Sequence, residues 1–135
     1  MNNSNKTRLV NVAIGLPASL PGIDIADTLR RIGNKPALLF ELLCELVQEH
    51  VGTPERIQAL LLQGDVAEAT RLAHSVKGIA MNLGCNTLAA AAKDLETTLV
   101  SGSSDLERQL SATAAALAEV QDSVAILRAQ HGPQP

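Results

Sequence analysis

His74 lies in the middle of a segment whose neighbouring residues could support chemistry at its ring. If the segment is helical, four residues share its face, at i−3, i+3, i+4 and i+7: Arg71, Lys77, Gly78 and Met81. Side chains on a helix lean toward its N-terminus, so the residue at i+4 is the one that would cover the imidazole. Gly78 has no side chain, and we therefore expect the ring to stay open.

An open imidazole close to an ammonium group meets the requirements of an incoming phosphoryl group. An unprotonated ring nitrogen is a nucleophile, and Lys77 would offset charge on the phosphoryl oxygens. The same residues also have simpler interpretations. Gly78 would permit close packing against another helix, although a mid-helix glycine costs about 1 kcal/mol relative to alanine. Lys77 would also serve as an ordinary surface charge.

Composition limits the classes of function that remain. The chain has 135 residues, 46% of them hydrophobic, a formal net charge of −3, one Phe and no Tyr or Trp. These values favour one compact domain and disfavour nucleic-acid binding. The apolar runs are short and interrupted by charge, which predicts no membrane span, and the N-terminus lacks a secretory signal. Cys44 and Cys85 are expected to be free thiols in a reducing cytosol.

Helical periodicity and helix-capping residues recur along the chain, and no segment alternates like a strand. Asp24 is expected to cap the first helix and Asn34 the second, and Asp65 begins a capping-box-like motif with Glu68. Glycines follow several of the segments, as at helix C-termini. The predicted helical segments are 25–32, 35–51, 54–63, 66–83, 87–100 and 105–130.

These segments predict an all-α fold, an antiparallel four-helix bundle with a short extra N-terminal helix. The bundle is expected to occupy residues 21–130. Residues 1–20 are expected to form a linker or flexible arm, and residues 131–135 a flexible tail.

The stretch AHSVKGIAMNLG at 73–84, followed by Leu88 and by Leu95-Glu96, resembles the histidine-containing phosphotransfer (HPt) domain of multistep two-component relays. The resemblance extends from LPGID at 20–24 to Leu127, and it includes the segments LLFELL and ALLLQGD. The His-x-x-Lys-Gly motif alone is a weak signal. It becomes specific when it is joined to Asn-Leu-Gly at 82–84 and to the Leu-Glu pair.

The resemblance implies a role for each residue of the motif. Nε2 of His74 would take a phosphoryl group from a receiver-domain aspartate and pass it to a second receiver. Lys77 would be the cation on the phosphate side, and Gly78 the gap through which a receiver approaches. Glu96 would hold the Nδ1 proton and so fix the tautomer, although a plain surface carboxylate is an equally good interpretation.

Four further residues are predicted to contact the partner: Arg71, Ile79, Met81 and Lys93. Ile79 or Met81 is expected at the rim of an apolar patch around His74. Met81 stands where the family usually has a small residue, so it would narrow the approach to the ring. For Arg71 and Lys93 the simpler interpretation, an ordinary solvated charge, is favoured over a partner contact.

The expected partners are the receiver domains of response regulators, with no nucleic acid and no membrane insertion. We expect no cofactor on this chain, because any Mg²⁺ would belong to the receiver's acidic pocket. The chain is expected to be a cytoplasmic monomer, either the C-terminal module of a bacterial hybrid sensor kinase or a free-standing carrier.

Two other classes of function remain open. A degenerate HPt domain would dock a receiver or regulatory partner without passing phosphate. An independent enzyme would require features that the sequence lacks: a Gly-rich nucleotide loop, paired metal-binding carboxylates or a second nucleophile. We therefore expect no autonomous kinase or ATPase activity.

Overall fold

The computed structural model describes residues 15–131, and within them it contains helices and one isolated antiparallel bridge between Leu20 and Ile23. The helices of this range are α2 (Ile25–Arg31), α3 (Pro36–His50), α4 (Thr53–Leu62), α5 (Val66–Asn82), α6 (Asn86–Ser101) and α7 (Leu106–His131). The predicted all-α helical bundle is confirmed.

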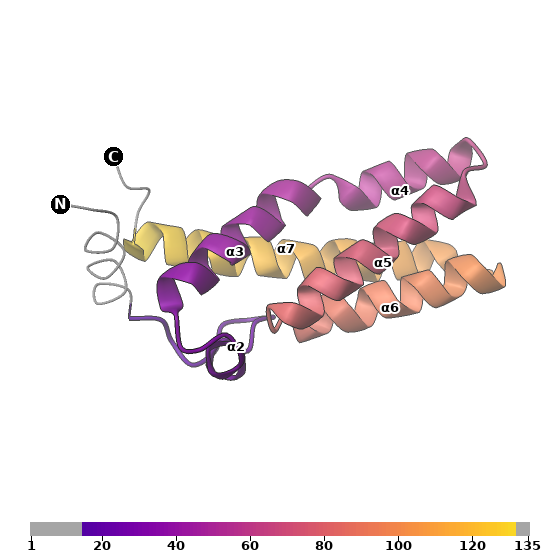
Figure 1. Cartoon of the computed structure of the whole chain (residues 1–135). Coiled ribbons are helices and arrows are strands. Elements are labelled where there is room, and N and C mark those ends of the chain that lie inside the picture. The colour runs from indigo at the N-terminus through magenta and orange to yellow at the C-terminus, as the bar shows by residue number, and fades with distance from the viewer. Residues whose placement is uncertain (1–14, 132–135) are drawn as a thin grey trace.

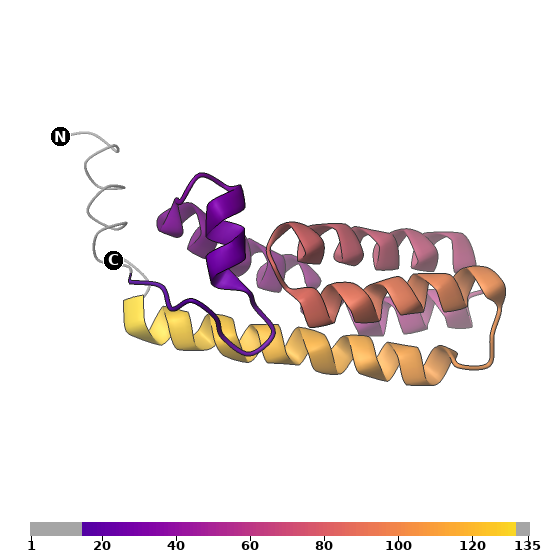
Figure 2. The ribbon, with the colours of Figure 1, turned by 90° about the horizontal axis from the view of Figure 1, so that it is seen from below.

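The helices form four sides of an elongated bundle. α3 and α4 follow one another along one side, and α5, α6 and α7 then run back and forth beside them (Figure 1). Seen from below, α6 lies between α5 and α7 (Figure 2). Gly52 lies between α3 and α4. Pro54, in the first turn of α4, has no backbone N–H, so it cannot donate the hydrogen bond that would continue α3 into α4. The two short helices therefore replace one long helix.

Two acidic caps determine where α2 and α5 begin. The backbone N–H of Asp27 donates to Asp24 Oδ1 over 3.1 Å, and that of Glu68 donates to Asp65 Oδ1 over the same distance. Both caps were predicted from the sequence. The cap on α5 matters for the site because α5 carries His74.

The predicted cap of α3 is wrong. Asn34 adopts a left-handed backbone with φ of 59°, and Lys35 is the N-cap, without a side-chain hydrogen bond. Pro36 then occupies the first turn, where its missing N–H costs no intrahelical bond. Asn34 therefore belongs to the turn that follows α2.

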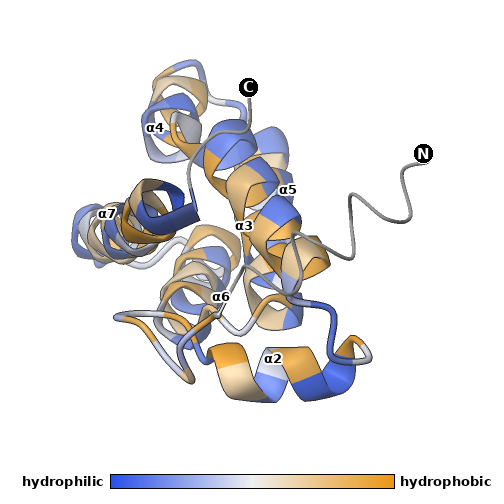
Figure 3. Cartoon of the chain, turned by 90° about the vertical axis from the view of Figure 1, so that its left-hand side faces the viewer, coloured by the Kyte–Doolittle hydropathy of each residue, from blue (hydrophilic) through white to orange (hydrophobic). Residues whose placement is uncertain are grey.

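Two apolar clusters fill the described part of the bundle. Figure 3 looks along the bundle from the α2 end, where α2 lies across the other helices and the larger cluster fills the space between α3, α5, α6 and α7. The smaller cluster lies toward the opposite end and comprises Ile57, Ala69, Leu72, Ala73, Leu95 and Leu99. The middle of α5 spans the junction between the two clusters.

Alanines line the contact between α5 and α6. Ala73 and Ala80 on α5 and Ala92 on α6 are fully buried. The distance between packed helices depends on the side chains at their contact, and short ones permit a close approach. Side chains at the solvent edge of this seam can therefore reach from one helix to the other.

The packed part of the chain begins before the predicted boundary at residue 21. Leu16 and Leu20 pack against the larger cluster, and the N–H of Ala26 donates to the carbonyl of Ala18 over 2.8 Å. Residues 15–20 of the predicted linker or arm therefore contact the bundle. The rest of that arm and residues 132–135 of the predicted tail lie outside the described residues.

Among the described helices, α7 is long and apolar enough to cross a membrane by length and composition, which the sequence analysis did not anticipate. Its apolar residues Leu117, Val120, Val124 and Leu127 lie in the core of the bundle. Burial in the core explains these four residues, which supply part of the apolar composition of α7.

Cys44 and Cys85 are both free, as predicted. Burial raises the pKa of the Cys85 thiol to about 12. The thiol therefore stays protonated at neutral pH and acts as a small apolar side chain in the core.

Candidate functional site

His74 points into solvent from the middle of α5, with 63% of its side chain exposed. The opposite side of α5 is the buried stripe of the helix, which includes Ala69, Leu72 and Val76. This stripe holds α5 firmly against the core. An exposed imidazole on a rigid, buried helix is fixed in position and still accessible to a partner.

Glu96 on α6 joins His74 to Lys77. Its Oε2 lies 2.8 Å from Nδ1 of His74, and its Oε1 lies 2.9 Å from Nζ of Lys77. An ionised carboxylate only accepts hydrogen bonds, so in the neutral ring it selects the tautomer with the proton on Nδ1. Nε2 then keeps its lone pair, and this nitrogen is free for nucleophilic attack.

The surroundings of Glu96 favour its ionised form. The hydrogen bond from Lys77 is the largest cause that holds the pKa of Glu96 below its ordinary value of 4.5; partial burial raises the pKa, and the bond to His74 lowers it further. The side chains of Glu96 and Lys77 are only 22% and 23% exposed. Glu96 is therefore a carboxylate at neutral pH, and its ion pair with Lys77 is partly shielded from water.

The sequence analysis predicted the ammonium of Lys77 close to the ring of His74, and it predicted no partner for Lys77. Its ammonium is bound to Oε1 of Glu96. In this structure the carboxylate of Glu96 therefore links Lys77 to His74. Direct contact of Lys77 with a phosphoryl group stays a prediction, and it would require the ion pair to open.

Gly78 faces open space. A Cβ added to it would meet no atom within 4 Å. The alternative interpretation of this glycine, close packing against another helix, is therefore wrong. The space beyond it, one turn after His74, is free for a partner.

We expect Gly78→Ala to stabilise the fold by about 1 kcal/mol, because alanine is the better helix former and the structure has room for its methyl group. The free energy of unfolding, measured by urea titration with circular dichroism, tests this expectation. A less stable variant would mean that the space beside Gly78 is occupied.

The two apolar residues predicted at the rim of the site lie on different sides of α5. Met81 is 57% exposed and lies about 20° around and about 10 Å along the helix from His74. Ile79 lies about 140° around the helix from His74 and packs against the larger core cluster. Met81 therefore shares the face of His74 at a distance of two turns, and Ile79 does not.

The two cations predicted to contact the partner are both exposed. Arg71 is paired within α5, where its Nε donates to Glu68 Oε1 over 2.8 Å. Lys93 lies one turn before Glu96 on α6 and forms no ion pair with any residue of the range 15–131. Of the two, Lys93 presents the charge that is available to a partner.

Sequence reasoning missed Arg31, which supports the C-terminal end of α5. Its Nη1 donates to the carbonyl of Asn82 over 3.2 Å, its Nη2 lies 3.5 Å from the carbonyl of Met81, and its Nε donates to Asp27 over 3.0 Å. A cation is favourable at the last carbonyls of a helix. No local signal could have revealed this contact, because its partners lie about fifty residues apart in the chain.

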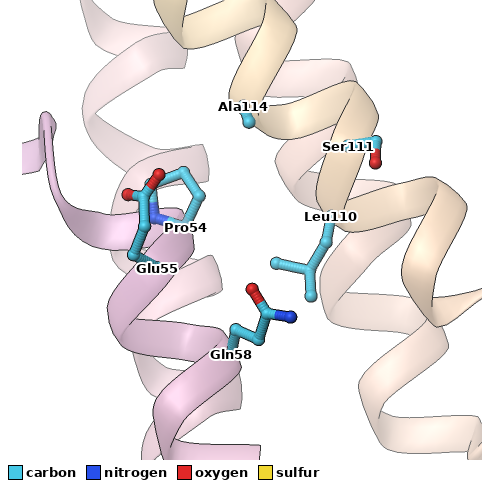
Figure 4. Close-up of a pocket in the computed structure, with 6 residues that line it drawn as sticks. All are labelled: Pro54, Glu55, Gln58, Leu110, Ser111 and Ala114. Carbon is cyan, nitrogen blue, oxygen red and sulfur yellow. The ribbon is translucent and has the colours of Figure 1, made fainter.

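A small pocket lies away from His74, between α4 and α7 (Figure 4). It is lined by Pro54, Glu55, Gln58, Leu110, Ser111 and Ala114. None of these residues belongs to α5 or α6, so the pocket is separate from the histidine site. Residues 15–131 contain no group of three or more His, Cys, Asp or Glu side chains that could hold a metal ion.

The fold and the site define a helical bundle that presents an exposed histidine oriented by a carboxylate. The model of the Hpt domain family matches residues 40–130, which is more than half of the chain and includes His74, Lys77, Gly78 and Glu96. The chain therefore belongs to the Hpt domain family, which implies a phosphotransfer role in two-component relays. Neither the curated proteins nor the solved structures contain a match to it.

Proposed function

We propose that this chain is a phosphoryl carrier: Nε2 of His74 accepts a phosphoryl group from the aspartate of one receiver domain and passes it to the aspartate of another. The observation that carries the proposal is the hydrogen bond between Nδ1 of His74 and Glu96 on an otherwise exposed ring. In the neutral ring, that bond places the proton on Nδ1 and leaves the lone pair of Nε2 available to a partner. We place the chain in the cytoplasm as a monomer, within a hybrid sensor kinase or as a separate carrier.

The transfer begins with attack of Nε2 on the phosphorus of an aspartyl phosphate. The nitrogen–phosphorus bond forms as the phosphorus–oxygen bond breaks, and the aspartate leaves as a carboxylate. The ring is then a cation, with its proton on Nδ1, and the carboxylate of Glu96 stabilises this charge. In the second step the carboxylate of another receiver attacks the phosphorus, and His74 leaves as the neutral imidazole. We assign the Mg²⁺ of both steps to the receivers.

Lys77 offsets the charge that Glu96 brings to the site. An unpaired carboxylate near Nε2 would repel the oxygens of an incoming phosphoryl group. The ion pair between Lys77 and Glu96 reduces that repulsion and holds the carboxylate at Nδ1. Glu96 and Lys77 are in this proposal positioning residues, and His74 is the nucleophile.

Glu96→Ala is expected to slow phosphorylation of His74 by on the order of 10-fold, because the ring loses the group that orients it. Glu96→Gln keeps an oxygen acceptor at Nδ1 without the charge, and its rate should lie between those of Glu96→Ala and the wild type. The rate is measured with phosphoramidate, a small donor that needs no partner protein. Equal rates for all three proteins would remove Glu96 from the mechanism.

The pH dependence of stability gives a second measurement on Glu96→Gln. Because folding lowers the pKa of Glu96 below 4.5, its interactions stabilise the fold above that pH and are lost as the pH falls through the folded value. On acidification below pH 4.5, Glu96→Gln should therefore lose less unfolding free energy than the wild type. An identical acid profile would show that the carboxylate is not stabilised in the folded state.

The experiment that tests the function uses the wild-type chain and a set of purified receiver domains. The chain is first treated with phosphoramidate and followed by intact mass, and the labelled protein is then mixed with each receiver. Labelling followed by transfer to a receiver supports the proposal. A folded chain that takes no label overturns it and favours the phosphate-independent docking module. Labelling by ATP alone would indicate an independent enzyme.

A further inference from the structure

The surface that α5 and α6 share around His74 differs between its two ends. Toward α2 it carries the side chains of Lys77 and Lys93. Toward the turn between α4 and α5 it carries two exposed valines, Val66 at 45% and Val100 at 74% exposure. We call these two valines the valine pair.

The helix directions place the valine pair on one side of the histidine. α5 and α6 run antiparallel (Figures 1 and 2), so the start of α5 lies beside the end of α6. Val66 lies eight residues before His74, about 12 Å along α5, and Val100 lies four residues after Glu96, about 6 Å along α6. Met81 is a third exposed apolar residue, on the opposite side of His74.

At the valine end of this surface α6 carries no charge, and on α5 Arg71 forms an ion pair with Glu68. Residues 97–104, from the end of α6 into the following turn, contain no charged side chain. The other end has the ammonium of Lys93, which is free of ion pairs within the range 15–131. Single exposed apolar residues are common on protein surfaces. Val66 and Val100 differ from such isolated residues because they lie on the same two helices as His74 and Glu96.

We propose that a receiver domain docks across α5 and α6 with the rim of its acidic pocket over Lys93 and an apolar surface over the valine pair. This inference rests on the proposed function, because it takes the receiver as the occupant. Charge complementarity determines the orientation: the carboxylates of the receiver face the ammonium of Lys93, and its apolar surface faces the valine end, where the guanidinium of Arg71 is already paired with Glu68. The valine pair thus contributes to the choice of receiver.

The size of a standard protein interface is large enough for one receiver to cover His74, the valine pair and Met81 together. A standard interface covers about 800 Å² on each partner, which corresponds to a radius of roughly 16 Å. A receiver centred on His74 would therefore reach both valines and Met81. Apolar contacts near the centre of an interface contribute most when they are fully desolvated, and Val100 is the closer of the two to the phosphoryl group.

The test compares Val100→Glu and Val100→Thr with the wild type and with Ile126→Glu. Ile126 is a matched control, because it is 44% exposed but lies on α7. For each protein we measure transfer to the receiver that accepts phosphate from the wild type, and labelling by phosphoramidate. Val100→Glu is expected to lower the ratio of transfer to labelling about 10-fold, Val100→Thr less, and Ile126→Glu not at all.

Each outcome separates the two proposals. If Val100→Glu has the same ratio of transfer to labelling as the wild type, the docking inference is overturned and the proposed function stays intact. A parallel fall in transfer and labelling also overturns it, because the substitution would then disturb the histidine site rather than docking. If the folded wild-type chain takes no label and transfers to no receiver, the proposed function fails and the inference fails with it.

Discussion

His74→Gln is expected to abolish phosphoryl incorporation. The amide of glutamine has no nucleophilic lone pair to replace Nε2, and the hydrogen bond between the ring and Glu96 is lost with the imidazole. Intact mass after treatment with phosphoramidate measures the effect. The wild type should gain one phosphoryl group that is removed by acid and kept in base, and the variant should gain none.

His50→Gln is the matched control for this experiment. His50 is half-buried near the end of α3, and its Nδ1 lies 3.0 Å from Thr53 Oγ1. Burial lowers the pKa of His50, but the ring faces no carboxylate in the arrangement seen at His74. His50→Gln should therefore be labelled like the wild type. If His74→Gln were labelled and His50→Gln were not, the nucleophile would be His50.

The stability of His74→Gln distinguishes a lost nucleophile from a lost fold. His74 is exposed, and substitutions at exposed positions usually change the free energy of unfolding by less than about 0.5 kcal/mol. A urea titration should therefore place the variant close to the wild type. A large destabilisation would mean that the contact with Glu96 holds α5 and α6 together.

Gly84→Ala is expected to destabilise the fold by about 2–4 kcal/mol. Gly84 has a φ of +73°, a conformation that disfavours any side chain. A Cβ at this position would overlap Thr28 Oγ1 and lie 2.7 Å from the backbone oxygen of Asp24. The first neighbour is a side chain, but the second is backbone and cannot rotate away. The midpoint of urea unfolding measures the effect.

Gly84 joins α2 to the turn between α5 and α6. Its carbonyl accepts a hydrogen bond of 2.9 Å from the N–H of Asp24. The double variant Gly84→Ala with Thr28→Ala should recover only the part of the loss that arises from the Thr28 hydroxyl. If Gly84→Ala were as stable as the wild type, α2 would not pack against this turn.

The two glycine variants form a matched pair with opposite signs. At Gly78 the helix is regular and the space is open, so alanine should stabilise. At Gly84 the backbone is left-handed and the space is filled, so alanine should destabilise. The amino-acid sequence places Gly78 inside a predicted helix and Gly84 just after its end, but only the structure shows that the space is open beside the first and filled beside the second.

The helices themselves were predictable because their signals are local. The segment predicted at 66–83 is α5 at Val66–Asn82, and the segment predicted at 87–100 is α6 at Asn86–Ser101. Capping aspartates and terminal glycines act on residues within one turn, so they can be identified without the fold. Asn34 misled this reasoning, since a residue with a short polar side chain suits both a cap and a left-handed turn.

The candidate site was predictable only in part. His74, Gly78 and Glu96 were singled out from the motif, and the structure brings His74 and Glu96 together across the α5–α6 seam. The partner of Lys77 was not predicted, because a long flexible side chain binds the nearest carboxylate that packing provides. That carboxylate is close because the alanines of the seam let α5 and α6 approach.

The sequence by itself determined the helices, their approximate ends and the presence of an open histidine on one of them. Only the tertiary structure decided that Lys77 pairs with Glu96, that Arg31 supports the end of α5, and that Val66 and Val100 lie on the same side of His74. The physical reason is the range of the interactions. Caps, turns and helical periodicity act within a few residues, whereas these contacts depend on how separate helices pack.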